Sequence, residues 1–276
     1  MSLAGKRVAV TGANTGVGRA TAEALAAEGA EVVLVCRSAA RARAALDAVG
    51  ARGSLVVADL ASLESVREAA RVLSARPLDA LVLNAAVAGA RGLTADGFEL
   101  AFGTNHLGHF LLARLLEPAL ALDARVVHLG SGAHERVRAL DLDALARPTR
   151  SRTGVAEYAV SKLCVMLFHQ ELARRFEGTG RRSVAADPGD VASEAYRNVP
   201  CLVRWLVTAR MKPPSEGARP TRFCLGSERA QNGRLYDANG ERAPSLLARD
   251  AALAAALWAR SEAWTGLRAL GPLMEA

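Results

Sequence analysis

The sequence predicts one α/β domain built on a doubly wound, mostly parallel sheet, and three observations carry that prediction. Short Val- and Leu-rich runs alternate with longer segments of helical periodicity. Apolar residues make up 51% of the 276 positions, which is enough for one large core. No long linker, repeat or low-complexity tract interrupts the chain. We therefore expect a single domain over residues 1–276, with right-handed crossovers and helices on both faces of the sheet.

Seven strands are expected, because seven short runs rich in Val, Leu or Ala are bounded by Gly, polar or charged residues. They are Arg7–Thr11, Glu31–Cys36, Ser54–Ala58, Ala80–Leu83, Arg125–Leu129, Arg182–Asp187 and a last run near Gly233–Asp237. Helical periodicity predicts helices over Gly16–Gly29, Ala39–Gly50, Ser62–Ser74, Ala95–Leu122 and Val155–Phe176. Two further segments, Arg136–Ala156 and Asp190–Pro214, are long for loops of a compact domain. Such loops are usually lids or binding loops, with plain surface decoration as the alternative.

Composition and local patterns limit which partners, metals and cellular locations we expect for this chain. A net charge of +7 invites a nucleic-acid hypothesis, but the arginines are scattered among Asp and Glu and form no stripe with aromatic residues. We expect no nucleic-acid partner. The cysteines (Cys36, Cys164, Cys201 and Cys224) lack metal-site spacing, so free thiols and no metal are expected. The N-terminus enters a predicted strand at once, and no apolar run reaches the ~18 residues of a membrane span. A cytoplasmic protein without signal peptide or membrane anchor is expected.

The first predicted strand runs into a glycine-rich turn, T11-G-A-N-T-G-V-G18, and then into a helix. Glycines in this context let backbone N–H groups approach a pyrophosphate at the helix N-terminus, where the helix dipole favours anions. The candidate contacts are Gly12, Asn14, Thr15, Gly16, Val17 and Gly18. A structural turn that binds nothing is the alternative.

The end of the second strand bears on the choice of nicotinamide cofactor. NAD-binding proteins usually place a carboxylate there for the ribose 2′-hydroxyl, whereas this chain has Cys36-Arg37-Ser38. Arg37 can clamp a 2′-phosphate bidentately, and Arg19 can contact the same phosphate or stack on adenine. NADP (as NADPH) is favoured over NAD, unless both arginines are ordinary surface charges.

The TGxxxGxG spacing resembles the short-chain dehydrogenase/reductase family, and the resemblance covers nearly the whole chain. It implies a Rossmann-type sheet of about seven strands in the order 3-2-1-4-5-6-7. L83-N-A-A86 is similar to the family's NNAG but departs from it at both ends. P188-G-D-V-A-S193 resembles the PGxVxT stretch that reaches the nicotinamide. The resemblance adds these cofactor contacts: Ser38, Asp59, Leu60, Asn84, Ala85, Pro188, Gly189, Val191 and Ser193.

The resemblance also implies a catalytic set of Asn105, Ser131, Tyr158 and Lys162. Tyr158 and Lys162 lie one helical turn apart in Y158-A-V-S-K162, and both are cofactor contacts as well. A phenol is a poor proton shuttle at neutral pH, but a neighbouring ammonium and the positive nicotinamide ring favour the tyrosinate and lower the pKa. Ser131 can hydrogen-bond the substrate oxygen, and Lys162 is long enough to reach the nicotinamide ribose.

Several details are similar to the retinol-dehydrogenase-like branch, whose substrates are lipophilic: TGANTGVG, CRS, NHLGHF and LWARSEAWTGL. The sequence thus predicts an oxidoreductase that interconverts a carbonyl and an alcohol on a lipophilic small molecule. We expect the loop at about 190–214 to close over that substrate. Relatives are often homodimers or homotetramers built on the helix that carries Tyr158.

Three hypotheses compete with this one. An epimerase or dehydratase of related fold is one, but such proteins usually carry TGxxGxxG and a larger substrate domain. A hydrolase would use Ser131 with His128 or His134 as the base, but the required G-x-S-x-G elbow is absent. A non-catalytic NADP-binding sensor or regulator on the same fold remains the alternative, although such proteins commonly lose the Tyr or the Lys. The residues leave open which substrate is used and which direction of the reaction is physiological.

Overall fold

The computed structural model describes residues 2–191 and 211–267, and its centre is an eight-stranded sheet. The strand order is β3-β2-β1-β4-β5-β6-β7-β8. All neighbours pair in parallel except β7 and β8, which form an antiparallel hairpin. The predicted order of the first seven strands is confirmed, and β8 is an addition. The strand bounds are β1 Arg7–Thr11, β2 Glu31–Cys36, β3 Gly53–Val57, β4 Leu78–Leu83, β5 Leu120–Leu129, β6 Arg182–Ala186, β7 Leu235–Asp237 and β8 Gly240–Arg242.

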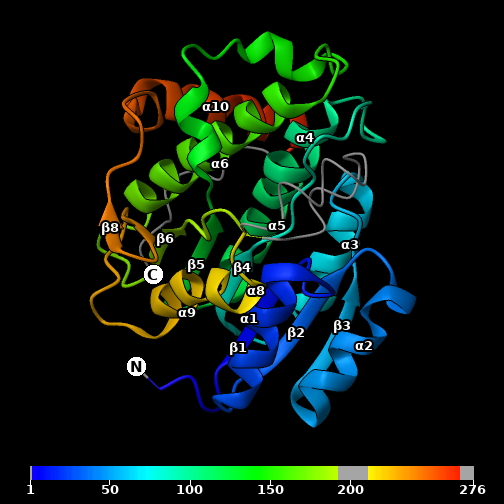
Figure 1. Cartoon of the computed structure of the whole chain (residues 1–276), viewed down its shortest axis with the longest axis vertical. Coiled ribbons are helices and arrows are strands. Elements are labelled where there is room, and N and C mark those ends of the chain that lie inside the picture. The colour runs from blue at the N-terminus through cyan, green and yellow to red at the C-terminus, as the bar shows by residue number, and fades with distance from the viewer. Residues whose placement is uncertain (1, 192–210, 268–276) are drawn as a thin grey trace.

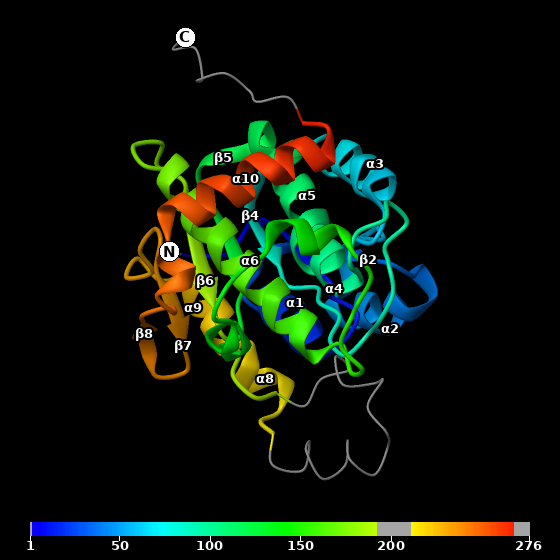
Figure 2. The same ribbon diagram turned by 90° about the horizontal axis from the view of Figure 1, so that it is seen from above.

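Helices cover both faces of this sheet, and each face has its own apolar core. On one face lie α1 (Gly16–Ala27), α2 (Ala39–Val49) and α9 (Arg219–Gly226), with the short α8 (Pro214–Gly217) beside α1. On the other lie α3 (Leu63–Leu73), α5 (Gly108–Leu116) and α6 (Val155–Arg175). A helix near the C-terminus, α10 (Ala251–Thr265), crosses over α5 and α6 (Figures 1 and 2). Strands β1, β2, β4 and β6 are mostly buried, as their apolar runs predict, whereas the edge strands β3 and β8 are partly exposed.

The helix expected over Ala95–Leu122 is wrong at both ends. Helix α4 (Leu100–Phe102) begins later, because the Glu99 carboxylate accepts the N–H of Phe102 as an N-cap. The chain then forms a π-turn over Gly103–Leu107 before α5. Pro118 lies in the 3₁₀ turn that follows α5, and Leu120 already pairs with Leu78 of β4. Apolar periodicity alone could not separate the end of the helix from the start of β5.

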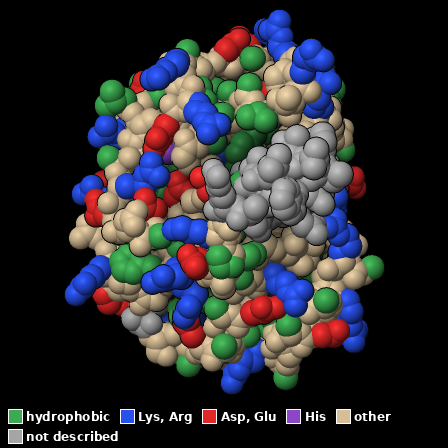
Figure 3. Space-filling view, viewed as in Figure 1, with side chains coloured by type: hydrophobic (Ala, Val, Ile, Leu, Met, Phe, Trp, Pro, Cys, Tyr) green, Lys and Arg blue, Asp and Glu red, His purple; other side chains and the backbone are tan. Residues whose placement is uncertain are grey.

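Basic and acidic side chains are interspersed over the face of the molecule in Figure 3, without one continuous basic stripe on the visible part that is described. Within residues 2–191 and 211–267, none of the helices combines the length and apolarity needed to span a membrane.

Candidate active site

The glycine turn between β1 and α1 brings the backbone close to β4. Gly12 and Gly16 adopt φ of 66° and 56°, a left-handed conformation that favours glycine. A Cβ on Gly18 would lie 2.3 Å from Asn84 Nδ2 and 2.4 Å from the carbonyl oxygen of Gly12. The Thr15 side chain does not cap α1, and the first turn holds no acidic residue. The N-terminus of this 12-residue helix therefore presents its N–H groups and positive dipole end to an anion.

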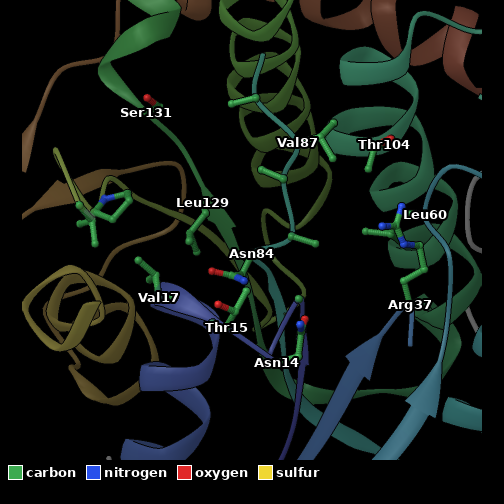
Figure 4. A pocket seen from close by; sticks show the side chains of 18 of the residues that line it. Asn14, Thr15, Val17, Arg37, Leu60, Asn84, Val87, Thr104, Leu129 and Ser131 are labelled. Carbon is green, nitrogen blue, oxygen red and sulfur yellow. The ribbon is translucent and has the colours of Figure 1, made fainter. Parts of the chain in front are cut away.

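A long pocket follows the carboxyl ends of the central strands, the usual place for ligands of an open α/β sheet. It brings together most of the predicted contacts: Gly12, Asn14, Thr15, Gly16, Val17, Gly18, Arg37, Ser38, Asp59, Leu60, Asn84, Ala85, Ser131, Tyr158, Lys162, Pro188, Gly189 and Val191. In Figure 4, Arg37 and Ser131 lie at opposite ends of it. Arg19 and Asn105 do not line it, and Ser193 lies outside the described residues.

The structure adds lining residues that sequence reasoning missed: Val35, Arg41, Ala58, Ala86, Val87, Ala88, Thr104, Leu129, Gly130 and Asp190. Most belong to strand ends next to predicted contacts, so position in the sheet was the available signal. Arg41 is the chemically important addition, since it lies four positions after Arg37 in the first turn of α2. That turn starts at Ser38, whose hydroxyl accepts the N–H of Arg41.

The Arg37 end of the pocket is suited to a phosphate. Arg37 and Arg41 both line it, and no carboxylate follows β2. Arg19 instead forms an ion pair within α1, where its Nε donates to Glu23 Oε1 at 2.7 Å.

Lys162 and Tyr158 lie at the other end of the pocket, one turn apart on α6. Lys162 is 4% exposed, and its Nζ donates to the carbonyl oxygen of Leu129 at 2.8 Å. Burial lowers the pKa of this ammonium from 10.5 to about 8, and nearby Asp187 opposes that shift. The Nζ lies 5.7 Å from the centroid of the Tyr158 ring, so positive charge sits beside the phenol. Ser131 follows the end of β5, and its Oγ accepts the N–H of Ala133 at 3.3 Å.

Asn105 is buried in the π-turn and acts between neighbouring segments. Its Oδ1 accepts the N–H of Val87 at 2.8 Å, and its Nδ2 donates to the carbonyl oxygen of Val87 at 3.0 Å. The same Nδ2 donates to Ser161 Oγ on α6 at 2.9 Å. Asn105 thus ties the chain that leaves β4 to the helix of Tyr158 and Lys162. In this structure its side chain contacts these two segments and does not line the pocket.

Asp187 organises the turn at the end of β6. One of its oxygens accepts the N–H of Gly189 at 2.9 Å, and the other lies 3.2 Å from Nη1 of Arg242 on β8. Arg242 also pairs with Glu135. The extra strand β8 therefore supplies a cation that compensates a carboxylate buried beside the Pro188-Gly189 turn.

The two histidines of the hydrolase reading are both occupied elsewhere. His128 is fully buried, with Nε2 3.1 Å from Ser183 Oγ. His134 Nδ1 donates to the backbone carbonyl of Ser131 at 2.6 Å, and its Nε2 accepts the N–H of Ser245 at 3.2 Å. Neither ring is bonded to the Ser131 hydroxyl. Among the described residues there is also no group of three His, Cys, Asp or Glu side chains placed to hold a metal ion.

Comparisons with known proteins agree with this geometry. The family model described as short chain dehydrogenase matches residues 6–140. Retinol dehydrogenase 13 of Homo sapiens is 36% identical over 97% of this chain and 87% of its own length. Dehydrogenase/reductase SDR family member 13 of Homo sapiens is 40% identical over 96% of this chain and 74% of its own length.

Two solved structures extend the comparison. An uncharacterized protein from Mycobacterium Paratuberculosis is similar with a TM-score of 0.81 and 35% identity, covering 96% of this chain and 95% of that one. A short chain dehydrogenase from Burkholderia cenocepacia, solved in complex with NADP, is similar with a TM-score of 0.70 and 27% identity. That match covers 87% of this chain and all of the other.

Proposed function

Because the chain belongs to the short-chain dehydrogenase/reductase family, in its retinol-dehydrogenase-like branch, we propose that this oxidoreductase uses NADP to interconvert a carbonyl and an alcohol on a lipophilic small molecule. One observation carries the proposal. A single pocket joins the glycine turn and Arg37 at one end to Ser131, Tyr158 and Lys162 at the other. Nucleotide recognition and proton-transfer groups are thus within one ligand's reach.

The lining of the pocket fits a dinucleotide. Gly12 and Gly18 leave no room for a Cβ against Ala85, Asn84 and their own turn, so glycine at these positions lets the turn pack against the end of β4 beside the N-terminus of α1, where a pyrophosphate would bind. Asp59, Leu60, Asn84 and Ala85 also line the pocket, and Leu60 lies beside Arg37 in Figure 4, where adenosine would lie. Arg37 is proposed to bind the 2′-phosphate that distinguishes NADP from NAD, with NAD as the weaker ligand. The complex of the Burkholderia cenocepacia relative with NADP supports this choice.

The proposed chemistry uses Tyr158, Ser131 and Lys162. A bound nicotinamide cofactor supplies or accepts the hydride. Tyr158 donates a proton to the substrate oxygen in reduction and takes it back in oxidation. Ser131 Oγ hydrogen-bonds the same oxygen and stabilises charge on it. Lys162, held by the carbonyl of Leu129, favours the tyrosinate and can reach the ribose.

The substrate is proposed to be a lipophilic ketone, aldehyde or alcohol, since the relatives that align with 96–97% of this chain include retinol dehydrogenases. The loop proposed to close over it, at about 190–214, falls mostly on residues outside those described. A cytoplasmic location and a homodimer or homotetramer also stay predictions. The face of α6 turned away from the sheet is packed by α10, so contact with a second copy would have to use other surfaces.

The deciding experiment follows NADPH oxidation with a panel of aromatic, steroid-like and polyketide-like ketones and with retinal. Wild-type protein should turn over at least one of them. Tyr158→Phe should bind NADPH within about twofold of wild type and lose at least ~10²-fold in turnover, the usual cost of a lost general acid. Wild-type turnover by Tyr158→Phe would refute the assigned role. Tight NADPH binding by wild type without turnover of any compound would favour the non-catalytic sensor instead.

A further inference from the structure

The motif N105-H-L-G-H109 contains a histidine that the proposed chemistry does not use. His109 lies in the first turn of α5, is 3% exposed, and bonds with both ring nitrogens. Its Nδ1 lies 2.9 Å from the backbone carbonyl oxygen of Asn105. Its Nε2 lies 2.8 Å from Oγ1 of Thr11, at the end of β1. A single buried ring therefore spans the distance between the helix that holds Asn105 and the strand that leads into the glycine turn.

Hydrogen-bond chemistry fixes the direction of each bond. The carbonyl oxygen of Asn105 can only accept, so His109 Nδ1 carries the proton and donates. Burial, with a smaller contribution from the Lys162 charge, lowers the pKa of His109 to about 4, so the ring is neutral and its Nε2 is an acceptor. The Thr11 hydroxyl must then be the donor to Nε2.

The Thr11 hydroxyl makes further bonds on the pocket side. Its oxygen accepts the N–H of Asn84 at 2.9 Å and the N–H of Ala85 at 3.0 Å. Asn84 and Ala85 both line the pocket at the level of the glycine turn. Because the Thr11 hydroxyl donates to His109 and accepts these two N–H groups, its one donor and both its acceptor positions are occupied. Its alternative acceptor, the carbonyl oxygen of Val82, is farther away at 3.3 Å.

We propose that His109 is a positioning residue that couples the two ends of the pocket, its Nδ1 fixing the backbone at Asn105 and its Nε2 fixing Thr11 and through it Asn84. The Nδ1 bond supports Asn105, which clamps Val87 and Ser161 and thereby the helix of Tyr158 and Lys162. The Nε2 bond supports the strand ends that face the nucleotide. The inference rests on the proposed function for its effect on turnover, but its effect on Thr11 stands on the hydrogen bonds alone.

Two substitutions of His109 test its two ring hydrogen bonds separately, because each removes one bond and keeps the other. Asparagine places an amide nitrogen where His Nδ1 was and cannot reach Thr11; glutamine places an amide oxygen near the position of Nε2 and loses the Nδ1 donor. His109→Asn should keep turnover within about twofold, weaken NADPH about threefold or more, and speed amide exchange at Asn84 and Ala85. His109→Gln should lower kcat about tenfold, which is the effect of one lost hydrogen bond. NADPH affinity and amide exchange at Asn84 should stay near wild type.

His169→Asn is the matched control. His169 is equally buried, bonds Ser183 Oγ through Nδ1 at 2.9 Å, and does not line the pocket. It should lose thermal stability comparably to the His109 variants without a change in kcat or NADPH affinity. The crossed pattern of the two His109 variants supports the proposal.

Equal losses in both His109 variants that track their melting temperatures, or no change in either, would overturn it. So would a control that behaves like His109→Gln. If wild type binds NADPH but turns over no ketone, the proposed reaction fails on its own, and the affinity and exchange measurements still decide the role of His109.

Discussion

Lys162 should cost the protein stability, so replacing it with methionine should give a more stable and inactive protein. The ammonium is fully buried, and its pKa is about 8 in the folded protein against 10.5 for a free lysine. A difference of that size corresponds to a penalty of about 3 kcal/mol for keeping the charge inside the fold at pH 7. Methionine fills similar space without charge, but it leaves the carbonyl oxygen of Leu129 without its donor, at a cost of about 1–2 kcal/mol.

The net expectation at pH 7 is a gain of about 1–2 kcal/mol, or a rise in Tm of roughly 2–6 °C for a chain of this size. The sign of the pH dependence follows from the lowered pKa. Between about pH 8 and 10.5 the unfolded chain holds the proton more tightly than the folded one, so raising the pH relieves the wild-type penalty. The advantage of Lys162→Met should therefore shrink by up to about 1.4 kcal/mol per pH unit above pH 8.

Urea unfolding of both proteins at several pH values from 7 to 9.5 measures this gap directly. Lys212→Met is the matched control, because Lys212 is exposed and its ammonium stays in water in the folded protein. Its stability should stay close to that of wild type. A Lys162→Met protein that is less stable than wild type at pH 7, or whose advantage is the same at every pH, would refute the burial argument. Turnover should fall at least ~10²-fold in the same variant if the lysine acts with Tyr158.

Three more expectations follow from the same structure. Arg37→Ala should weaken NADPH about 10- to 100-fold by the loss of a charge-assisted hydrogen bond and leave NADH little changed, as titration of both cofactors can measure; equal losses would show that Arg37 does not bind the phosphate. Gly18→Ala should weaken both cofactors alike and lower Tm, because its Cβ would lie 2.3 Å from Asn84 Nδ2. Burial lowers the pKa of His106 to about 3 and of His169 to about 4, so stability should fall as pH drops from 6.5 towards 4, where only the unfolded chain takes up protons. Unfolding curves at pH 4.5–7 should show a shallower acid limb, by up to roughly 1.4 kcal/mol per pH unit, in His169→Asn.

The parts of the site that could be predicted from the sequence are those encoded by short local motifs. The glycine turn, the Tyr158–Lys162 pair and the strand ends each need only a few adjacent residues, and the pocket contains them all. Strand order followed from alternation and from the family resemblance, and it is confirmed up to β7. Arg41 could in principle have been predicted, because the first turn of a helix that starts at Ser38 lies next to the end of β2.

What the sequence did not reveal depends on contacts between distant segments. Arg242 reaches Asp187 from a hairpin strand of three residues, too short for any periodic signal. The π-turn that holds Asn105 looks like ordinary helix in the sequence, since apolar residues continue on both sides of it. Helix α10 carries many alanines and shows no strong amphipathic stripe, and its place over α5 and α6 depends on long-range contacts. Trp258 on α10, for example, lies 5.0 Å from the guanidinium of Arg114 on α5 and 4.0 Å from that of Arg175 on α6.

The charge states of the buried basic side chains distinguish the structural groups from the one that the proposed reaction uses. His106, His109, His128 and His169 lie in the core with pKa values depressed by burial, so they serve as neutral hydrogen-bonding groups. Lys162 differs from these histidines, because a pKa of about 8 leaves it charged at neutral pH. A fold selected for stability alone would place an apolar side chain there. The cost in stability falls at the position where the proposed function needs an ammonium beside Tyr158 to favour proton transfer, and this supports placing the proposed reaction at this end of the pocket.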